Sequence, residues 1–119
     1  MKVEIYTVAI DGGTVGSHLM RGPFASDGEF YFLESIWILA PFTFNPGATI
    51  DFGTVSNPTL ILSGYDLSFL SGTVPEMIYT NTATTSQSHV GAREPFLLTV
   101  NVADLLSGQL GMYLFAHRF

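Results

Sequence analysis

Residues 29–44 read EFYFLESIWILAPFTF and decide the fold, because they form the longest apolar run of the chain and contain its single tryptophan, Trp37. Side chains of an extended strand alternate between two faces, and this run is apolar on both. One face would carry Phe30, Phe32, Ile36 and Ile38, and the other Tyr31, Leu33, Trp37 and Leu39. Such a strand must be covered on both faces, by a second layer of the protein or by a partner chain. We therefore predict a central strand of a β-sandwich or barrel, with Trp37 packed in its core.

A charged residue, Glu34, interrupts this apolar run. We interpret it first as a β-bulge or an exposed edge position, where a strand bends and its alternation shifts. The alternative is a carboxylate that pairs with an arginine across an interface. Together with Pro41, Glu34 also leaves the run short of the ~20 apolar residues that a membrane-spanning helix needs. No association with a membrane is expected.

Short apolar segments separated by turn signals make up the rest of the chain. Alternation is clearest over 96–102, where Phe96, Leu98, Val100 and Val102 should point inward. Asp-Gly at 11–12 and Pro-Gly at 46–47 are strong turn signals. The expected strands are 2–10, 14–20, 29–44, 48–52, 59–63, 76–81, 96–102 and 110–119, with an irregular bridge over 64–72 and a turn over 104–109.

This succession of short strands, without a sustained helical period, predicts an all-β fold. A chain of 119 residues is of ordinary size for one domain. We expect residues 1–119 to form a single antiparallel β-sandwich domain that is jelly-roll-like. An immunoglobulin-like sandwich is the alternative.

The composition bears on the partners of the protein. Hydrophobic residues make up 47% of the chain and charged residues only 12%, which suggests that part of the exterior is hidden against another molecule. A monomer covered by Ser, Thr, Asn and Gly is the simpler alternative. The basic residues, Lys2, Arg21, Arg93 and Arg118, are scattered, and the net charge is −6. No nucleic acid partner is expected, because phosphate binding needs clustered basic residues.

No group of residues encodes a recognisable chemistry. The histidines, His18, His89 and His117, are isolated and show no metal-ligand spacing, and the chain has no cysteine. Asp51, Asp66 and Asp104 fall near expected turns or strand ends, where aspartate commonly bonds nearby backbone. We therefore predict no catalytic residue, no cofactor-binding residue and no metal ligand, and the protein is not expected to be an enzyme.

From about Ser35 to its end, the layout of the chain resembles small all-β virion proteins of tailed bacteriophages. The first shared piece is G-x-x-I-D-x-G-T, which runs from Gly47 to Thr54. An L-x-G-x-D-L run follows from Leu62 to Leu67, after which a Thr-rich polar segment leads to a final hairpin. The hairpin pattern covers 96–102 and 107–115. The second aspartate common near the G-T piece is replaced here by the sequence VSNP at 55–58.

The resemblance implies a head decoration, or cement, protein. Such a protein binds the capsid surface and stabilises contacts between neighbouring major capsid protein subunits, commonly as a trimeric homo-oligomer. Such a protein is located in the host cytoplasm during assembly and on the capsid surface of the finished virion. The role needs a surface rather than a motif, and no single residue is assigned by it.

Two other functions stay open at this point. A tail or head-fibre module could bind a host glycan through exposed aromatic rings and the polar segment 80–95, with Trp37 or a tyrosine as the stacking platform. A metal-dependent enzyme would require the three histidines to converge in space.

Overall fold

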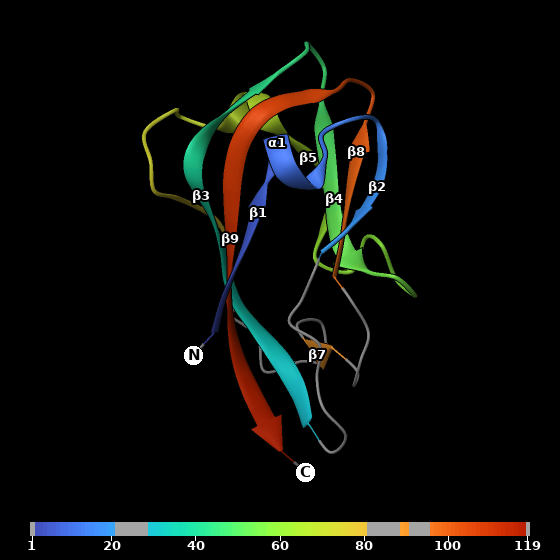
Figure 1. Ribbon diagram of the computed structural model, residues 1–119, viewed down its shortest axis with the longest axis vertical. Helices are drawn as coiled ribbons and strands as arrows, with labels where there is room; N and C mark the ends of the chain where they lie inside the picture. Colours follow the sequence, from blue (N-terminus) through green and yellow to red (C-terminus); the bar gives the residue numbers. More distant parts are fainter. Residues whose placement is uncertain (1, 21–28, 81–88, 91–95, 119) are drawn as a thin grey trace.

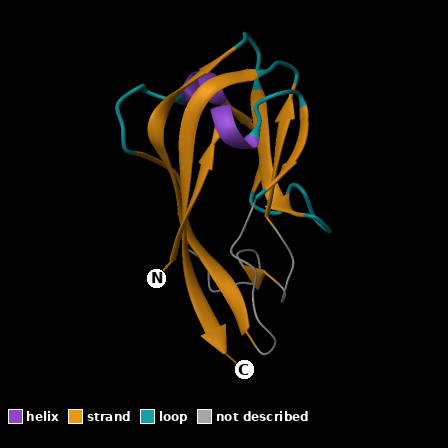
Figure 2. Cartoon of the chain, viewed as in Figure 1, coloured by secondary structure: helices purple, strands orange, loops and turns teal. Residues whose placement is uncertain are grey.

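The computed structural model describes residues 2–20, 29–80, 89–90 and 96–118, and it describes side chains over 3–20, 33–80 and 96–114. Strands dominate, and the helices are single short turns (Figure 2). Among the described residues, no helix has the length and apolar character needed to cross a membrane. In chain order the elements are β1 (Lys2–Thr7), α1 (Val8–Asp11), β2 (Gly16–Leu19), β3 (Glu29–Phe44), β4 (Thr49–Thr54), β5 (Leu62–Asp66), η1 (Leu67–Phe69), β6 (Glu76–Thr80), β7 (His89–Val90), β8 (Phe96–Asn101) and β9 (Leu105–Arg118).

The strands form two antiparallel sheets that pack face to face (Figure 1). Sheet A has the order β1-β9-β3-β6, with the short β7 pairing with β3, and sheet B has the order β2-β8-β4-β5. The chain passes from one sheet to the other after β1, β2 and β3, and this interleaving is the strand order of a jelly roll. In an immunoglobulin sandwich the first two strands share a sheet instead. The predicted all-β sandwich with a jelly-roll-like order is confirmed.

The core lies between the inner faces of the two sheets. On sheet B, the rings of Phe52 and Phe96 stack with centroids 5.6 Å apart. Every second residue of β4 and β8 is buried, as the alternating sequence pattern predicted. The side chains that are at most 1% exposed include Tyr6, Leu33, Ile36, Ile38, Leu110, Met112 and Leu114 from sheet A, and Ile50, Phe52, Phe96, Leu98 and Val100 from sheet B.

The long strand β3 lies between β9 and β6, as expected of a central strand. Its pairing with β9 shifts register between Leu33 and Ser35, so that Glu34 is the extra residue of a β-bulge. The bulge interpretation of Glu34 is confirmed, and it corrects the simple alternation. Leu33 points into the core with Ile36, whereas a strand without the bulge would have placed it on the opposite face.

Three expected boundaries are wrong. The first strand ends at Thr7, and residues 8–11 form one helical turn that begins the passage from sheet A to sheet B. The strand expected over 59–63 lies at Leu62–Asp66, and the turn expected over 104–109 is mostly the start of β9. Val102 is 74% exposed rather than buried, because its φ of 73° turns the chain out of β8. The N–H of Ala103 bonds the carbonyl of Asn101 at 2.8 Å, which closes a γ-turn around Val102.

Candidate functional site: the outward face of sheet A

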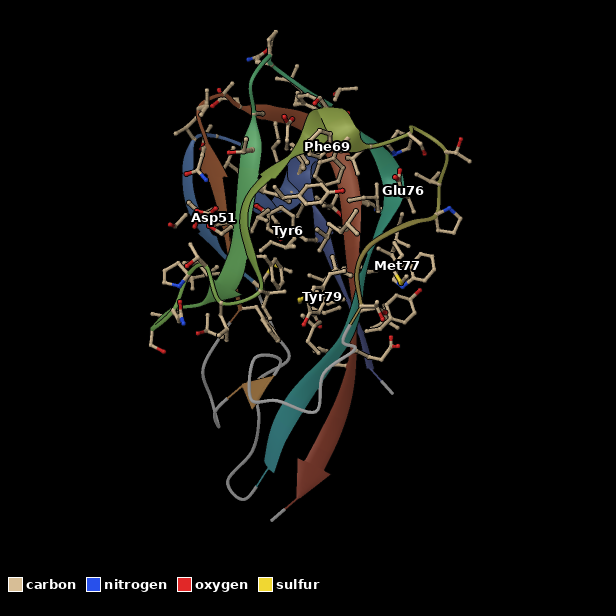
Figure 3. All side chains as sticks on the ribbon, turned by 180° about the vertical axis from the view of Figure 1, so that it is seen from behind. Tyr6, Asp51, Phe69, Glu76, Met77 and Tyr79 are labelled. Carbon is tan, nitrogen blue, oxygen red and sulfur yellow. The ribbon has the colours of Figure 1, made fainter. Side chains whose placement is uncertain are left out.

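The outward sides of the two sheets differ in chemistry. On sheet A an apolar surface extends over four strands, and we call it the outer apolar face. In Figure 3, Met77 lies on the side of sheet A away from Tyr6, which points between the sheets. The side chains of this face contributed by the edge strands remain well exposed: Val3 by 46%, Ile5 by 42% and Met77 by 47%. The outer apolar face consists of Val3, Ile5, Trp37, Leu39, Met77 and Tyr113.

Backbone pairing aligns the middle of this face in one row across the sheet. Ile5 pairs with Gly111, Gly111 with Trp37, and Trp37 with Met77. Gly111 leaves a gap in the row, and Leu39 fills it. A Cβ added at Gly111 would lie only 2.7 Å from Cδ1 of Leu39. The glycine therefore lets an aliphatic side chain lie flat on the sheet.

A hollow of about 460 Å³ opens on the outer apolar face, and its lining is mainly apolar. The rings of Trp37 and Tyr113 stand on it with centroids 6.4 Å apart and planes tilted by 46°. The indole Nε1–H of Trp37 donates to Oγ of Ser35 at 2.9 Å, and that hydroxyl donates to Glu34. These bonds fix the indole and engage its one donor. The hollow is lined by Glu34, Ser35, Trp37, Leu39, Pro75, Met77 and Tyr113.

The prediction that Trp37 packs in the core between the sheets is therefore wrong. Trp37 is partly buried on the outward side, together with Leu39. The sequence did contain the relevant signal, because both faces of residues 36–39 are apolar. It did not say which face meets sheet B.

The outward side of sheet B is mostly polar, with the exception of Leu19 on β2, which is 58% exposed. Ser17 and Thr99 pair across β2 and β8, and their hydroxyl oxygens lie 3.1 Å apart. On β4, Oδ1 of Asp51 accepts the N–H of Gly64 at 2.7 Å. An antiparallel sheet with one wetted side is ordinary for a sandwich. The contrast singles out sheet A as the side suited to contact with another molecule.

A smaller cavity of about 120 Å³ lies at the end of the sandwich, between β3 and the segment from η1 to β6. Apolar side chains such as Phe42, Leu67 and Leu70 line most of it. The carboxylate at its rim belongs to Glu76, whose Oε1 accepts bonds from the N–H and the hydroxyl of Ser71, both at 3.0 Å. The space is enough for one small apolar group.

The histidines do not form a site in the described part of the chain. His18 lies on β2, and its Nε2 is 2.7 Å from the carbonyl oxygen of Thr14. The side chains of His89 and His117 lie outside the described residues, as do residues 81–88 and 91–95 of the polar segment. No group of three or more His, Asp or Glu side chains that could hold a metal occurs among the residues whose side chains are described.

The three singled-out aspartates hold the backbone of loops and strand ends. Asp66 behaves as predicted: its Oδ1 accepts the N–H of Ser68 at 2.9 Å, which lowers the pKa of Asp66. Asp104 reaches further than predicted, because its Oδ1 accepts the N–H of Val15 at 2.9 Å. These hydrogen bonds to backbone N–H groups give Asp51, Asp66 and Asp104 structural roles.

The residues that carry the resemblance to virion proteins also have structural roles. Gly47 adopts a positive φ of 88° at the turn before β4. Gly53 lies against the loop that follows, because a Cβ there would be 2.2 Å from the carbonyl oxygen of Asn57. No family model, curated protein or solved structure matches this chain.

Proposed function

We propose that this protein is a structural binding module that attaches to other protein subunits through its outer apolar face. In line with the resemblance described above, the proposed role is that of a bacteriophage capsid decoration protein. It would bind the head surface, stabilise contacts between major capsid protein subunits, and assemble as a homo-oligomer, expected to be a trimer. The proposal assigns no catalytic residue, cofactor, metal, nucleic acid or membrane.

The observation that supports this proposal is the exposed apolar area that extends over the strands of sheet A, beside a sheet B whose outward side is mostly polar. Val3, Ile5 and Met77 are each more than two-fifths exposed although they lie within β-strands. A fully buried side chain of this size contributes about 1.5–3 kcal/mol, so covering the exposed part of these three would contribute about 2–4 kcal/mol. Repetition over the symmetric surface of a shell would add to the binding.

Binding of a host glycan through a tail or head-fibre module is the second candidate. The tilted pair of Trp37 and Tyr113, with Glu34 at the edge of the same hollow, is the observation that favours it. Sugar recognition combines such rings with several polar groups that fix orientation. Here the indole donor is engaged by Ser35, and Leu39 and Met77 line the rest of the hollow. The composition of the hollow therefore favours a protein partner.

The proposal is tested with phage heads that were assembled without this protein. We expect the purified protein to cosediment with these heads and to raise the temperature at which they rupture. The outer-face variant V3T/I5T/M77Q keeps residues suited to strands or of similar length, and removes apolar area. The loss of about 2–4 kcal/mol corresponds to binding that is roughly 30- to 700-fold weaker.

A matched control lies on sheet B. The variant S17A/T99A removes the two facing hydroxyl groups on the outward side of that sheet and should bind heads like the wild type. Failure of the wild-type protein to bind would end the proposal. Loss of binding in the sheet B variant, with the outer-face variant unaffected, would assign the contact to the other side of the molecule. A glycan array that gives a signal abolished by Trp37→Ala would favour the second candidate.

A further inference from the structure

The edge strand β1 is the most regular free edge in the described part of the molecule. It pairs six consecutive residues with β9 without a register shift, and no described strand pairs with its other side. The other edges are shorter or interrupted. β2 has four residues, the pairing of β5 with β4 shifts register, and the pairing of β6 with β3 does the same. Short length and irregular pairing are two ordinary protections of an edge, and β1 lacks both; a third is a charged side chain, which β1 has in Glu4.

A hydrogen bond at the end of β1 shows which backbone groups face outward. The N–H of Thr7 donates to Oδ2 of Asp11 at 2.8 Å, so it is directed to a side chain and not to β9. Backbone N–H groups of an extended strand alternate in direction, as do its carbonyl groups. The N–H and C=O groups of Val3 and Ile5 therefore point to the free edge, as the N–H of Thr7 does. The carboxylate of Asp11 therefore engages the outward N–H of Thr7 at the end of the strand. The outward backbone groups of Val3 and Ile5 have no partner strand among the described residues.

Glu4 lies between these two positions and bonds toward β9 through its backbone, opposite Met112. For a strand added on the free edge, Glu4 would occupy the non-hydrogen-bonded position, where facing side chains approach most closely. Its side chain is partly buried. The chain as a whole carries a net charge of −6, and Asp11 adds a second carboxylate along the same edge. The edge therefore favours a positive side chain directly opposite Glu4.

We propose that β1 accepts an extended segment of a partner protein as an additional strand of sheet A, with a basic residue opposite Glu4 and apolar residues opposite Val3 and Ile5. The backbone bonds of Val3 and Ile5 hold the segment, and Glu4 selects it by charge. The apolar side chains of the added strand extend the outer apolar face beyond Val3 and Ile5. This inference deepens the proposed function and rests on its premise that the protein binds other proteins.

A second copy of this chain fits the edge less well. Antiparallel self-pairing that uses Val3 and Ile5 of both copies places Glu4 opposite Glu4 of the second copy. Directly opposed like charges destabilise a strand pair. A foreign strand carries no such penalty.

The test uses the isolated protein and two labelled peptides, so that it does not depend on capsids. One peptide has the central sequence Thr-Val-Lys-Val-Thr, which reads the same in both directions, and the other has Glu in place of Lys. Fluorescence anisotropy should show the Lys peptide binding about tenfold more tightly than the Glu peptide. The variant Glu4→Lys should invert this preference. Equal binding of both peptides, or of neither, would overturn the proposal.

A backbone variant separates strand addition from contact with the apolar face. Ile5→Pro removes an outward N–H and should abolish binding of the Lys peptide, whereas Ile5→Thr keeps that N–H and should retain most of it. Should Ile5→Pro fail to fold, a Lys peptide methylated on its two valine nitrogens tests the complementary bonds, which the peptide N–H groups donate to the carbonyls of Val3 and Ile5. Retained binding in either case would contradict strand addition. If the wild-type protein forms a dimer in the absence of peptide and the Ile5→Pro variant is a monomer, the edge binds a second copy of the chain. That result would overturn the choice of a foreign partner.

The two proposals can fail separately. Loss of head binding in the outer-face variant combined with no peptide binding would retain the proposed function and remove the strand addition. Peptide binding without any head binding would support the added strand and remove the capsid role.

Discussion

Val102 holds backbone strain that one substitution should release. Among the described residues, it is the non-glycine residue with a positive φ, at 73°, and it is β-branched. Such conformations cost about 1–3 kcal/mol. Glycine adopts them freely, so Val102→Gly should remove most of this cost.

Two smaller effects oppose this gain. Glycine makes the unfolded chain more flexible, which lowers the free energy of unfolding by about 0.4–1 kcal/mol. Val102 is 74% exposed, so losing its side chain forfeits only a quarter of its burial, about 0.4 kcal/mol. With about 2 kcal/mol of relieved strain, the balance is a stabilisation of about 1 kcal/mol. The melting temperature should rise by about 3–6 °C.

The measurement is thermal unfolding followed by circular dichroism, with Val15→Gly as the matched control. Val15 is another exposed valine, at 53%, but it is not among the described residues with a positive φ. Val15→Gly should therefore lower stability by about 1 kcal/mol through chain flexibility and lost burial. If both variants lower the melting temperature by similar amounts, no strain is stored at Val102 and the reasoning is refuted.

Three further predictions concern the core, the pH dependence and the outer apolar face. Gly13→Ala should cost about 1–3 kcal/mol or more in urea unfolding, because its Cβ would lie 2.3 Å from the backbone oxygen of Leu105; an unchanged midpoint would contradict this close approach. Burial first, and the carboxylate of Asp11 second, raise the pKa of Tyr6 above its usual 10.0, so its contribution to stability is complete below pH 10 and is lost as the pH rises further; Tyr6→Phe should reduce this alkaline fall, and an identical pH profile would argue against it. Iodide should quench the fluorescence of Trp37 in the free protein, and bound heads should protect it; a tryptophan insensitive to iodide in the free protein would place it in the core instead.

The pattern of residues predicted the class of fold because alternation survives in most strands. β4 and β8 bury every second residue, as Ile50 and Leu98 illustrate. β3 departs from alternation because Glu34 adds one residue, and a bulge reverses the faces of everything beyond it. The charged residue Glu34 within an apolar run indicated where the alternation shifts. Which side chains point inward before and after the bulge depends on the pairing of β3 with β9.

The candidate site was predictable only in part. The sequence indicated that residues 36–39 carry more apolar surface than one face can hide, and it indicated that charged residues are too few for an ordinary exterior. It could not place Trp37 outside, because the choice of inner face depends on which side meets sheet B. In the row formed by Ile5, Gly111 and Trp37, each pair of bonded neighbours is more than 70 positions apart in the chain, so the row arises only from strand pairing.

What the sequence determined by itself is a β-sandwich with surplus apolar surface, because period-two alternation and turn residues are local properties of the chain. What only the tertiary structure decided is where that surplus lies and which edge is free. Both depend on long-range pairing: the strand order places Val3, Trp37 and Met77 on one side of sheet A and leaves the outer side of β1 without a described partner. Neither feature can be read from neighbouring residues, because each is a relation between strands that are distant in sequence.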